Sequence, residues 1–179
     1  MARVAIFTSG ILIEPQGHEQ IQSYVELAKY VKQQAVGAKG YIDRAKVSQD
    51  VEGGTVLDHD WGKWGSYTIP RFYDGSHQGT ERRIVQTLSL WQTLQHVFDY
   101  AYSGQHVAAL RQRNNWFALS QGRFPNHTLW WVGDDETPTW EDACCRNEYL
   151  YDYGASPFAF TLKAAFDSAG RSVKLHRRS

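Results

Sequence analysis

The sequence predicts an α+β domain with a ferredoxin-like antiparallel sheet and helices on one face of that sheet. Segments with alternating apolar residues are interspersed with segments of helical apolar spacing, in the order strand, helix, strand, loop, strand, helices, strand, helix, strand. Such an order is typical of an antiparallel sheet packed against helices. The length of 179 residues suits one ordinary domain and is short for two, so residues 1–179 are expected to form a single domain.

A sheet of this kind buries one face under its helices and leaves the other face uncovered. Two such sheets can cover each other by pairing into a barrel, which also removes exposed sheet edges. The fold class therefore predicts a homodimer that forms a dimeric α/β barrel.

The N-terminal segments are expected to form two strands and the helix between them. Residues 4–13 are β-rich, and their alternation suits a strand that is buried on both sides or lies at an interface. From Glu19 onward a helix is expected, which ends near the glycines at 37 and 40, and residues 41–47 form a second strand. The apolar face of this helix comprises Ile21, Tyr24, Val25, Ala28, Val31 and Ala35.

Residues 50–79 form the irregular part of the sequence. They are rich in glycine and dotted with aromatic residues, with one short strand candidate at residues 67–72. A segment of this composition is expected to be a loop or hairpin over the mouth of a pocket, that is, a lid, rather than a separate domain.

The C-terminal half is expected to supply the remaining strands and helices. Ser103 is positioned to cap the second helix of this half, and Thr139 to cap the last helix, with Asp142 near its positive end. Residues 167–179 form a polar tail. The expected strands are residues 83–91, residues 127–132 and a closing strand over Phe158, Phe160 and Leu162, and the expected helices are residues 93–102, 103–117 and 139–154.

Composition narrows the classes of function. The formal net charge is zero, which argues against a nucleic-acid partner, and only the short tail with Lys174, Arg177 and Arg178 is basic. Aromatic residues make up 14% of the chain and seven of them are tryptophan. Some of this aromatic surface is expected to line a cavity or an oligomer interface.

The N-terminal sequence and the cysteines bear on location. Residues 1–15 carry Arg3 as their only basic residue and Glu14 and Pro15 where a cleavage region would lie, so neither a secretory signal nor a membrane span is expected.

Cys144 and Cys145 are adjacent, and a bridge between neighbours would strain the peptide. Reduced thiols in a cytoplasmic protein are therefore expected.

An ordered set of short sequences resembles one branch of the dimeric α/β-barrel superfamily, whose best-known members are the antibiotic-biosynthesis monooxygenases. The resemblance leaves out residues 50–79 and the C-terminal tail, and the branch is mostly labelled a domain of unknown function. The sequences are F-T-S-G-I-L at 7–12, G-Y-I-D-R-A at 40–45, T-L-S-L-W at 87–91, Y-A-Y-S-G-Q-H-V-A-A-L-R-Q-R-N-N-W-F at 100–117, H-T-L-W-W-V-G-D-D-E-T-P-T-W-E-D-A at 127–143 and G-A-S-P-F-A-F at 154–160.

The resemblance implies a homodimer with a pocket between sheet and helices in each protomer. Several relatives oxidise or rearrange aromatic polyketides without a cofactor, and others isomerise, cyclise or dehydrate. The implied function is an enzyme of natural-product metabolism, a monooxygenase or a cyclase/isomerase, which acts on a hydrophobic aromatic, polyketide or polyene substrate. A non-catalytic dimer that binds a metabolite is a further alternative.

Heme binding is the other function that the resemblance raises. Heme-degrading relatives carry their iron-binding histidine on the second helix, where this chain has His106. The position one turn later, where the ligand is expected by comparison, is Leu110. No organic cofactor is therefore expected, and heme remains the alternative.

His106 is the principal candidate for catalysis. Helical spacing would place Tyr102 and Arg113 on its flank, at i−4 and i+7. A neutral imidazole there could remove a phenol or enol proton, with Tyr102 orienting it and Arg113 stabilising the enolate oxygen. The alternative is that His106 hydrogen-bonds backbone where two helices meet and performs no chemistry.

Aromatic residues are the candidates for substrate contact. Strand alternation sends Trp130 and Trp131 to opposite faces of the sheet, so only one of them can face a given cavity. Packing in the core or in a dimer interface is the alternative role for each tryptophan. The candidates are Tyr67, Trp91, Phe98, Trp116, Trp130 and Trp131.

Other kinds of site find little support. Asp58, His59 and Asp60 offer metal-ligating atoms, but adjacent residues in an extended loop seldom bind one ion, so no protein-bound metal is expected. A nucleophilic cysteine would need a neighbouring base or positive charge, and one of Cys144 and Cys145 should simply be core. The sequence contains neither a glycine-rich phosphate loop nor a G-x-S-x-G motif.

Overall fold

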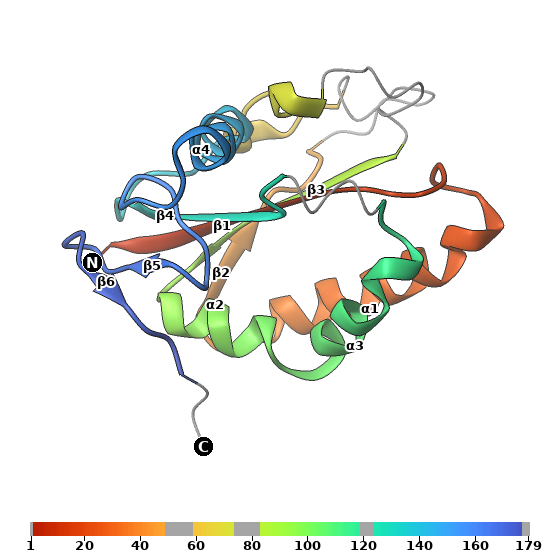
Figure 1. Cartoon of the computed structure of the whole chain (residues 1–179), viewed down its shortest axis with the longest axis horizontal. Coiled ribbons are helices and arrows are strands. Elements are labelled where there is room, and N and C mark those ends of the chain that lie inside the picture. The colour runs from red at the N-terminus through yellow and green to blue at the C-terminus, as the bar shows by residue number, and fades with distance from the viewer. Residues whose placement is uncertain (1, 49–58, 74–82, 119–123, 177–179) are drawn as a thin grey trace.

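A four-stranded antiparallel sheet forms the centre of the molecule in the computed structural model, which describes residues 2–48, 59–73, 83–118 and 124–176. The strand order is β2-β3-β1-β4, so that β1 lies inside the sheet between β3 and β4 (Figure 1). This order is compatible with a ferredoxin-like arrangement. The strands are β1 (Arg3–Ile11), β2 (Tyr41–Arg44), β3 (Ile84–Trp91) and β4 (His127–Val132).

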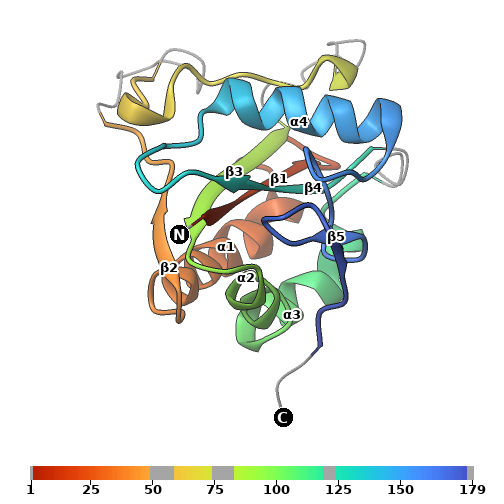
Figure 2. The ribbon, with the colours of Figure 1, turned by 90° about the vertical axis from the view of Figure 1, so that its left-hand side faces the viewer.

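The predicted α+β class and the four main strands are confirmed. The prediction of helices on one face is wrong, because helices lie on both faces of the sheet (Figures 1 and 2). We call these the α1 face and the α4 face. The α1 face carries α1 (Gln22–Val36), α2 (Leu94–Ala101) and α3 (Gly104–Gln112), and the α4 face carries α4 (Trp140–Tyr153).

The start and end of α4 are set by local chemistry that the sequence predicted. The Thr139 hydroxyl accepts the Asp142 N–H at 3.1 Å, and the Asp142 carboxylate accepts the Thr139 N–H at 3.2 Å, which completes a capping box. Gly154 ends the helix with a φ of 79°, a conformation that favours glycine. Buried Trp140 and Ala143 then direct the helix onto Phe7 and Trp130 of the sheet.

The helix pair after β3 is interrupted at Tyr102 and Ser103. Ser103 does occupy the N-cap position of α3, but its hydroxyl donates to the Tyr100 carbonyl at 3.2 Å and makes no capping bond. Gly104 has a φ of 47°, and a side chain there would collide with Gln34 of α1. The second helix ends at Gln112 and continues as a short 3-10 turn, so the helix predicted to run to residue 117 is shorter than expected.

Residues 59–73, which we call the strap, pack on the α4 face beside α4. The predicted strand at residues 67–72 is wrong, since this part contains no regular strand and ends in the 3-10 turn Arg71–Tyr73. The Tyr67 ring lies 4.8 Å from that of Trp140, and the Cys144 thiol donates to the Thr68 carbonyl at 3.1 Å. The strap therefore belongs to the core, and the rest of the predicted lid, residues 50–58 and 74–79, lies outside the described residues.

The C-terminal segment differs from its prediction in two ways. The closing strand over residues 158–162 is reduced to one bridge with the sheet, in which Leu129 and Phe160 exchange backbone hydrogen bonds of 2.8 and 3.0 Å. The tail predicted to be polar, residues 167–179, contributes β6 (Ser172–Val173) to a hairpin with the preceding β5 (Ala165–Phe166), and apolar side chains of both strands pack against the α1-face core.

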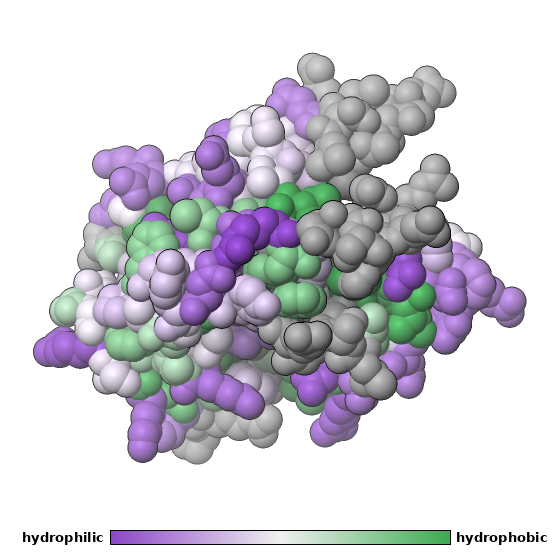
Figure 3. Space-filling view, turned by 45° about the horizontal axis from the view of Figure 1, so that its top comes forward, coloured by the Kyte–Doolittle hydropathy of each residue, from purple (hydrophilic) through white to green (hydrophobic). Residues whose placement is uncertain are grey.

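The covered α4 face removes the physical reason given above for pairing two sheets. Trp64, Tyr67 and Trp140 already bury the apolar side chains of that face, and the described residues form an open sheet rather than a closed barrel. Seen from this side, the described surface mixes hydrophilic and hydrophobic side chains (Figure 3). A dimer stays a prediction, but the uncovered sheet face on which that prediction was based is not present.

Trp140→Ala is expected to lower the free energy of unfolding by about 3–5 kcal/mol, because it removes a fully buried ring that contacts Phe7, Trp61 and Tyr67. Urea denaturation followed by circular dichroism measures the change. Tyr153→Ala, in the same helix but 76% exposed, is the control and should cost no more than about 1 kcal/mol. Equal losses in the two variants would contradict the packing of α4 on the sheet.

Candidate functional site

A row of three polar side chains crosses the α1 face of the sheet. Thr8 of β1 pairs in register with Thr87 of β3 on one side and with His127 of β4 on the other. The hydroxyl oxygens of Thr8 and Thr87 are 2.6 Å apart and hydrogen-bonded. Thr87 is exposed to solvent although β3 is an interior strand, so helices do not seal this part of the face.

Apolar clusters flank this polar row along the strands. One cluster gathers Val4, Trp91, Val97 and Leu129 under α2. The other gathers Leu12, Ile21 and Trp116 where α1 begins. Between them, the side chains of α1 that face the sheet, among them Leu27 and Val31, are only half-buried. The α1 face therefore combines a polar, solvent-accessible middle with apolar ends.

His106 lies at the joint between α2 and α3, close to this row. Its Nδ1 is 2.8 Å from the carbonyl oxygen of Ala101, at the C-terminus of α2, and its ring centroid is 5.0 Å from that of Tyr100. Since a carbonyl only accepts, Nδ1 carries the proton and Nε2 has the lone pair. The described residues offer Nε2 no hydrogen-bond partner.

The side chain of His106 is therefore a neutral base at neutral pH. Burial lowers the pKa of His106 below its ordinary value, and the hydrogen bond to Ala101 only partly offsets this. The predicted alternative, in which His106 bonds backbone where two helices meet, describes its Nδ1 correctly. The same hydrogen bond also fixes the direction in which Nε2 points. The catalytic role of His106 remains a prediction.

His127, at the end of the polar row, has the same tautomer but both nitrogens are occupied. Its Nε2 accepts the Leu162 N–H at 3.2 Å, which leaves the proton on Nδ1, 2.6 Å from the side-chain oxygen of Asn126. Burial lowers the pKa of His127 to about 4, with smaller contributions from the charges of Lys163 and His106. His106 is thus close enough to interact electrostatically with the row.

The helical spacing proposed for Tyr102 and Arg113 does not hold across this joint. Tyr102 lies between α2 and α3, outside both helices, and packs its 36% exposed ring 4.7 Å from Phe98. Arg113 is exposed beyond the end of α3. The orientation of His106 that was assigned to Tyr102 is supplied by the Ala101 carbonyl.

The predicted aromatic residues do not line one cavity. Trp91 and Trp116 are buried in the two clusters that flank the polar row, where their indole N–H groups donate to Ser89 and Ser23, both at 3.0 Å. Phe98 is half-buried on α2. Tyr67 belongs to the strap and lies on the opposite face of the sheet.

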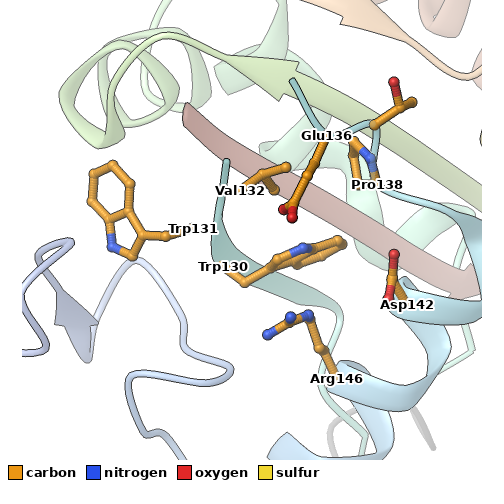
Figure 4. A pocket seen from close by; sticks show the side chains of 8 residues that line it. Trp130, Trp131, Val132, Glu136, Pro138, Asp142 and Arg146 are labelled. Carbon is orange, nitrogen blue, oxygen red and sulfur yellow. The ribbon is translucent and has the colours of Figure 1, made fainter. Parts of the chain in front are cut away.

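Trp130 and Trp131 point to opposite faces, as the alternation predicted, yet both border a cleft at the free edge of β4 (Figure 4). The cleft has a volume of about 350 Å³. It is lined by Trp130, Trp131, Val132, Glu136, Thr137, Pro138, Asp142 and Arg146.

Cysteine and metal chemistry find no site among the described residues. Cys144 is buried and Cys145 is exposed, and both are free thiols. Burial raises the pKa of the Cys144 thiol to about 12, so it is core, as predicted for one of the pair. Among the described residues, no group of three His, Cys, Asp or Glu side chains could hold a metal ion, and Asp58, one of the three residues weighed above, lies outside them.

Sequence reasoning missed four groups: the Ala101 carbonyl, Thr8, Thr87 and Arg146. A sequence signal existed for the threonines, since each interrupts a strand whose side chains on that face are mostly apolar. The Ala101 carbonyl and Arg146 gave none, because their roles depend on how helices end and pack.

Comparison with known proteins gives a family without a function. A family model described as "Domain of unknown function (DUF3291)" matches residues 3–176. No curated protein matches the sequence. A similar solved structure is the crystal structure of a conserved protein from Methanosarcina mazei Go1, with 11% sequence identity, a TM-score of 0.41, and coverage of 74% of this chain and 92% of that chain. No described helix is long and apolar enough to cross a membrane.

We expect the free energy of unfolding to fall as the pH drops below 6.5, the ordinary pKa of a histidine and the value expected for His127 in the unfolded chain. Above pH 6.5 the histidine is neutral in both states, and its contribution is fully present. Between pH 6.5 and about 4 the unfolded state binds the proton first, which should cost roughly 3 kcal/mol in total. Urea denaturation at a series of pH values measures this.

His127→Gln is the control for that prediction. Its amide oxygen can still accept the Leu162 N–H but does not titrate, so this variant should lose much less stability over the same pH range. An equal loss in both proteins would show that other groups cause it.

Proposed function

Because the chain belongs to the family described as "Domain of unknown function (DUF3291)", its own side chains have to indicate its function, and we propose that it is a small-molecule enzyme in which His106 is the general base. The observation that carries the proposal is the neutral His106 imidazole, which is held at Nδ1 by the Ala101 carbonyl, has no hydrogen bond at Nε2 with a described residue, and interacts electrostatically with His127 of the polar row. A positioned histidine that is neutral at neutral pH is the usual general base of enzymes.

The polar row supplies a hydrogen-bond donor that can act together with this base. The hydroxyls of Thr8 and Thr87 share one hydrogen bond, so one of the two hydroxyl protons is left to donate to a substrate. In the proposed step, His106 Nε2 removes the proton of a phenol or enol, and the threonine hydroxyl donates to the oxygen that becomes negative. The electron pair stays on the substrate as an enolate.

The two apolar clusters favour a hydrophobic substrate that lies across the row. Such an enolate can pass an electron to dioxygen, or it can close a ring or isomerise. The resemblance to the monooxygenase-containing superfamily supports a role in natural-product metabolism without an organic cofactor. Pairing of two sheets into a barrel is no part of the proposal, because α4 covers the face that would be used.

Two steps test the proposal. Native mass spectrometry of the purified protein, with release and identification of any bound compound, supplies a substrate lead and reports the oligomeric state. Turnover of that compound is then compared between wild type and His106→Asn, whose amide N–H can still donate to the Ala101 carbonyl but which has no basic nitrogen. His106→Asn should lose about 10²–10⁴-fold in kcat.

His176→Ala, which removes an exposed histidine, is the matched control and should keep wild-type turnover. Full turnover in His106→Asn would exclude His106 as the base. Binding of the compound without any product, in wild type as well, would instead favour the non-catalytic metabolite-binding protein.

The geometry of His106 also supports heme binding as a second candidate function. Histidines that ligate metals commonly donate their other ring N–H to a carbonyl, as His106 does to Ala101. His106 Nε2 would then hold the iron, and the heme would supply redox chemistry that the side chains of this chain lack.

Addition of heme to the purified protein checks this second candidate. If it is correct, a Soret absorbance with a saturable endpoint should appear in the wild type and in His176→Ala, and it should be lost in His106→Asn. A spectrum identical to free heme in all three proteins would remove the candidate without affecting the general-base proposal.

A further inference from the structure

The cleft at the edge of β4 is a separate site from the one around His106, since none of its lining residues comes from α1, α2 or α3. Its floor is built by Trp130 and Val132, which are buried, and its rim by the loop from Glu136 to Pro138 and the first two turns of α4. Figure 4 shows Trp130 between the Glu136 carboxylate and the Arg146 guanidinium.

Arg146 is a half-buried cation that lines this cleft. Its guanidinium lies 5.4 Å from the Trp130 ring centroid and 4.2 Å from that of Phe158, and it donates to the Phe158 carbonyl. Arg146 makes no ion pair with any described residue, and its Nε is buried without a hydrogen-bond partner there. Buried charges in proteins are normally paired, so this cleft has the character of an anion site.

Two observations support that character. Burial lowers the pKa of Arg146, and the charges of Asp142, Cys145 and Glu136 offset this only in part. The free edge of β4 supplies a further donor, because Leu129 turns its N–H and C=O outward to Phe160. Peptide groups alternate along a strand, so the N–H of Trp131, two residues later, also faces outward beside the cleft.

The rim of the cleft carries the opposite charge. Glu136 accepts the Gly133 N–H with Oε2, and Asp142 accepts the N–H and hydroxyl of Thr139 with Oδ2. Each carboxylate therefore keeps one oxygen that no hydrogen bond with a described residue uses. A ligand with only negative charge would be repelled by this rim, whereas a ligand with both charges would match the cleft at both ends.

We propose that this cleft binds a small zwitterion, whose carboxylate pairs with Arg146 and whose ammonium group pairs with Glu136. Because Arg146 Nε has almost no accessible surface, the carboxylate pairs with the terminal nitrogens of the guanidinium, and the apolar part of the ligand lies against Trp130. Compounds of the amino-acid class have this chemistry. The site is independent of His106, so it can be present whether or not the proposed enzyme function is correct.

Titration with ε-aminocaproate, a flexible zwitterion, tests the proposal. Two-dimensional proton–nitrogen correlation spectra of the full chain show the Nε–H signal of Arg146, which is assigned by its absence in Arg146→Gln. Saturable movement of that signal is expected. Caproate, which lacks the ammonium group, should bind about two- to fivefold more weakly, and hexylamine should not move the signal.

Substitutions then separate the two ends of the site. Arg146→Gln should lower the affinity for ε-aminocaproate by about tenfold or more, measured on the backbone signals of the cleft. Glu136→Gln keeps an acceptor for the Gly133 N–H, and it should reduce the affinity for the zwitterion to that for caproate. Arg111→Gln, an exposed arginine of α3, is the control and should bind like wild type.

Arg146→Lys is a more conservative variant for the case in which Arg146→Gln does not fold, because it retains the positive charge but lacks Nε. It should bind more weakly than wild type and more tightly than Arg146→Gln. An Arg146 signal that does not respond to ε-aminocaproate, or equal affinity in wild type and a folded Arg146→Gln, would overturn the proposal.

Discussion

Burial of β1 on both edges and both faces is the constraint on which the rest of the structure depends. The strand pairs with β3 from Val4 to Ile11 and with β4 from Arg3 to Thr8. Val4 on one face and Ala5, Phe7 and Ile11 on the other are all buried. A strand with apolar side chains on both faces needs a layer on each side. The first three helices provide one layer, and α4 with the strap provides the second.

The polar row of Thr8, Thr87 and His127 is the exception within this arrangement. Most other strand side chains on the α1 face are apolar, and Ser89 accepts the indole N–H of Trp91, but here two hydroxyls bond each other and a histidine is held neutral by burial. Places where a chain departs from the pattern of its own core are commonly functional sites. His106 brings Nε2, a basic nitrogen, to the same region. The polar row and this base can therefore act on one substrate.

The strands and the start of α4 could be predicted because their signals are local. Alternation defines a strand, and a threonine followed three residues later by aspartate completes a capping box. The face on which α4 packs could not be predicted, since an apolar stripe such as that of Trp140 and Ala143 fits either side of a sheet. The predicted closing strand is not formed, because only Phe160 of that segment pairs with the sheet, at Leu129, whereas Ala159 pairs locally with Ser156.

In the candidate site, too, the identity of a residue could be predicted from the sequence, but its surroundings could not. His106 was identifiable as a chemical group, but its environment was set by the break at Tyr102 and Ser103, which leaves the Ala101 carbonyl at the end of α2 without a helical partner. That carbonyl fixes the tautomer of the imidazole, and the fixed tautomer decides which nitrogen can act as a base or a ligand. The interaction that ends one helix is therefore also the one that prepares His106 for chemistry, and a structural and a functional role are not alternatives at this position.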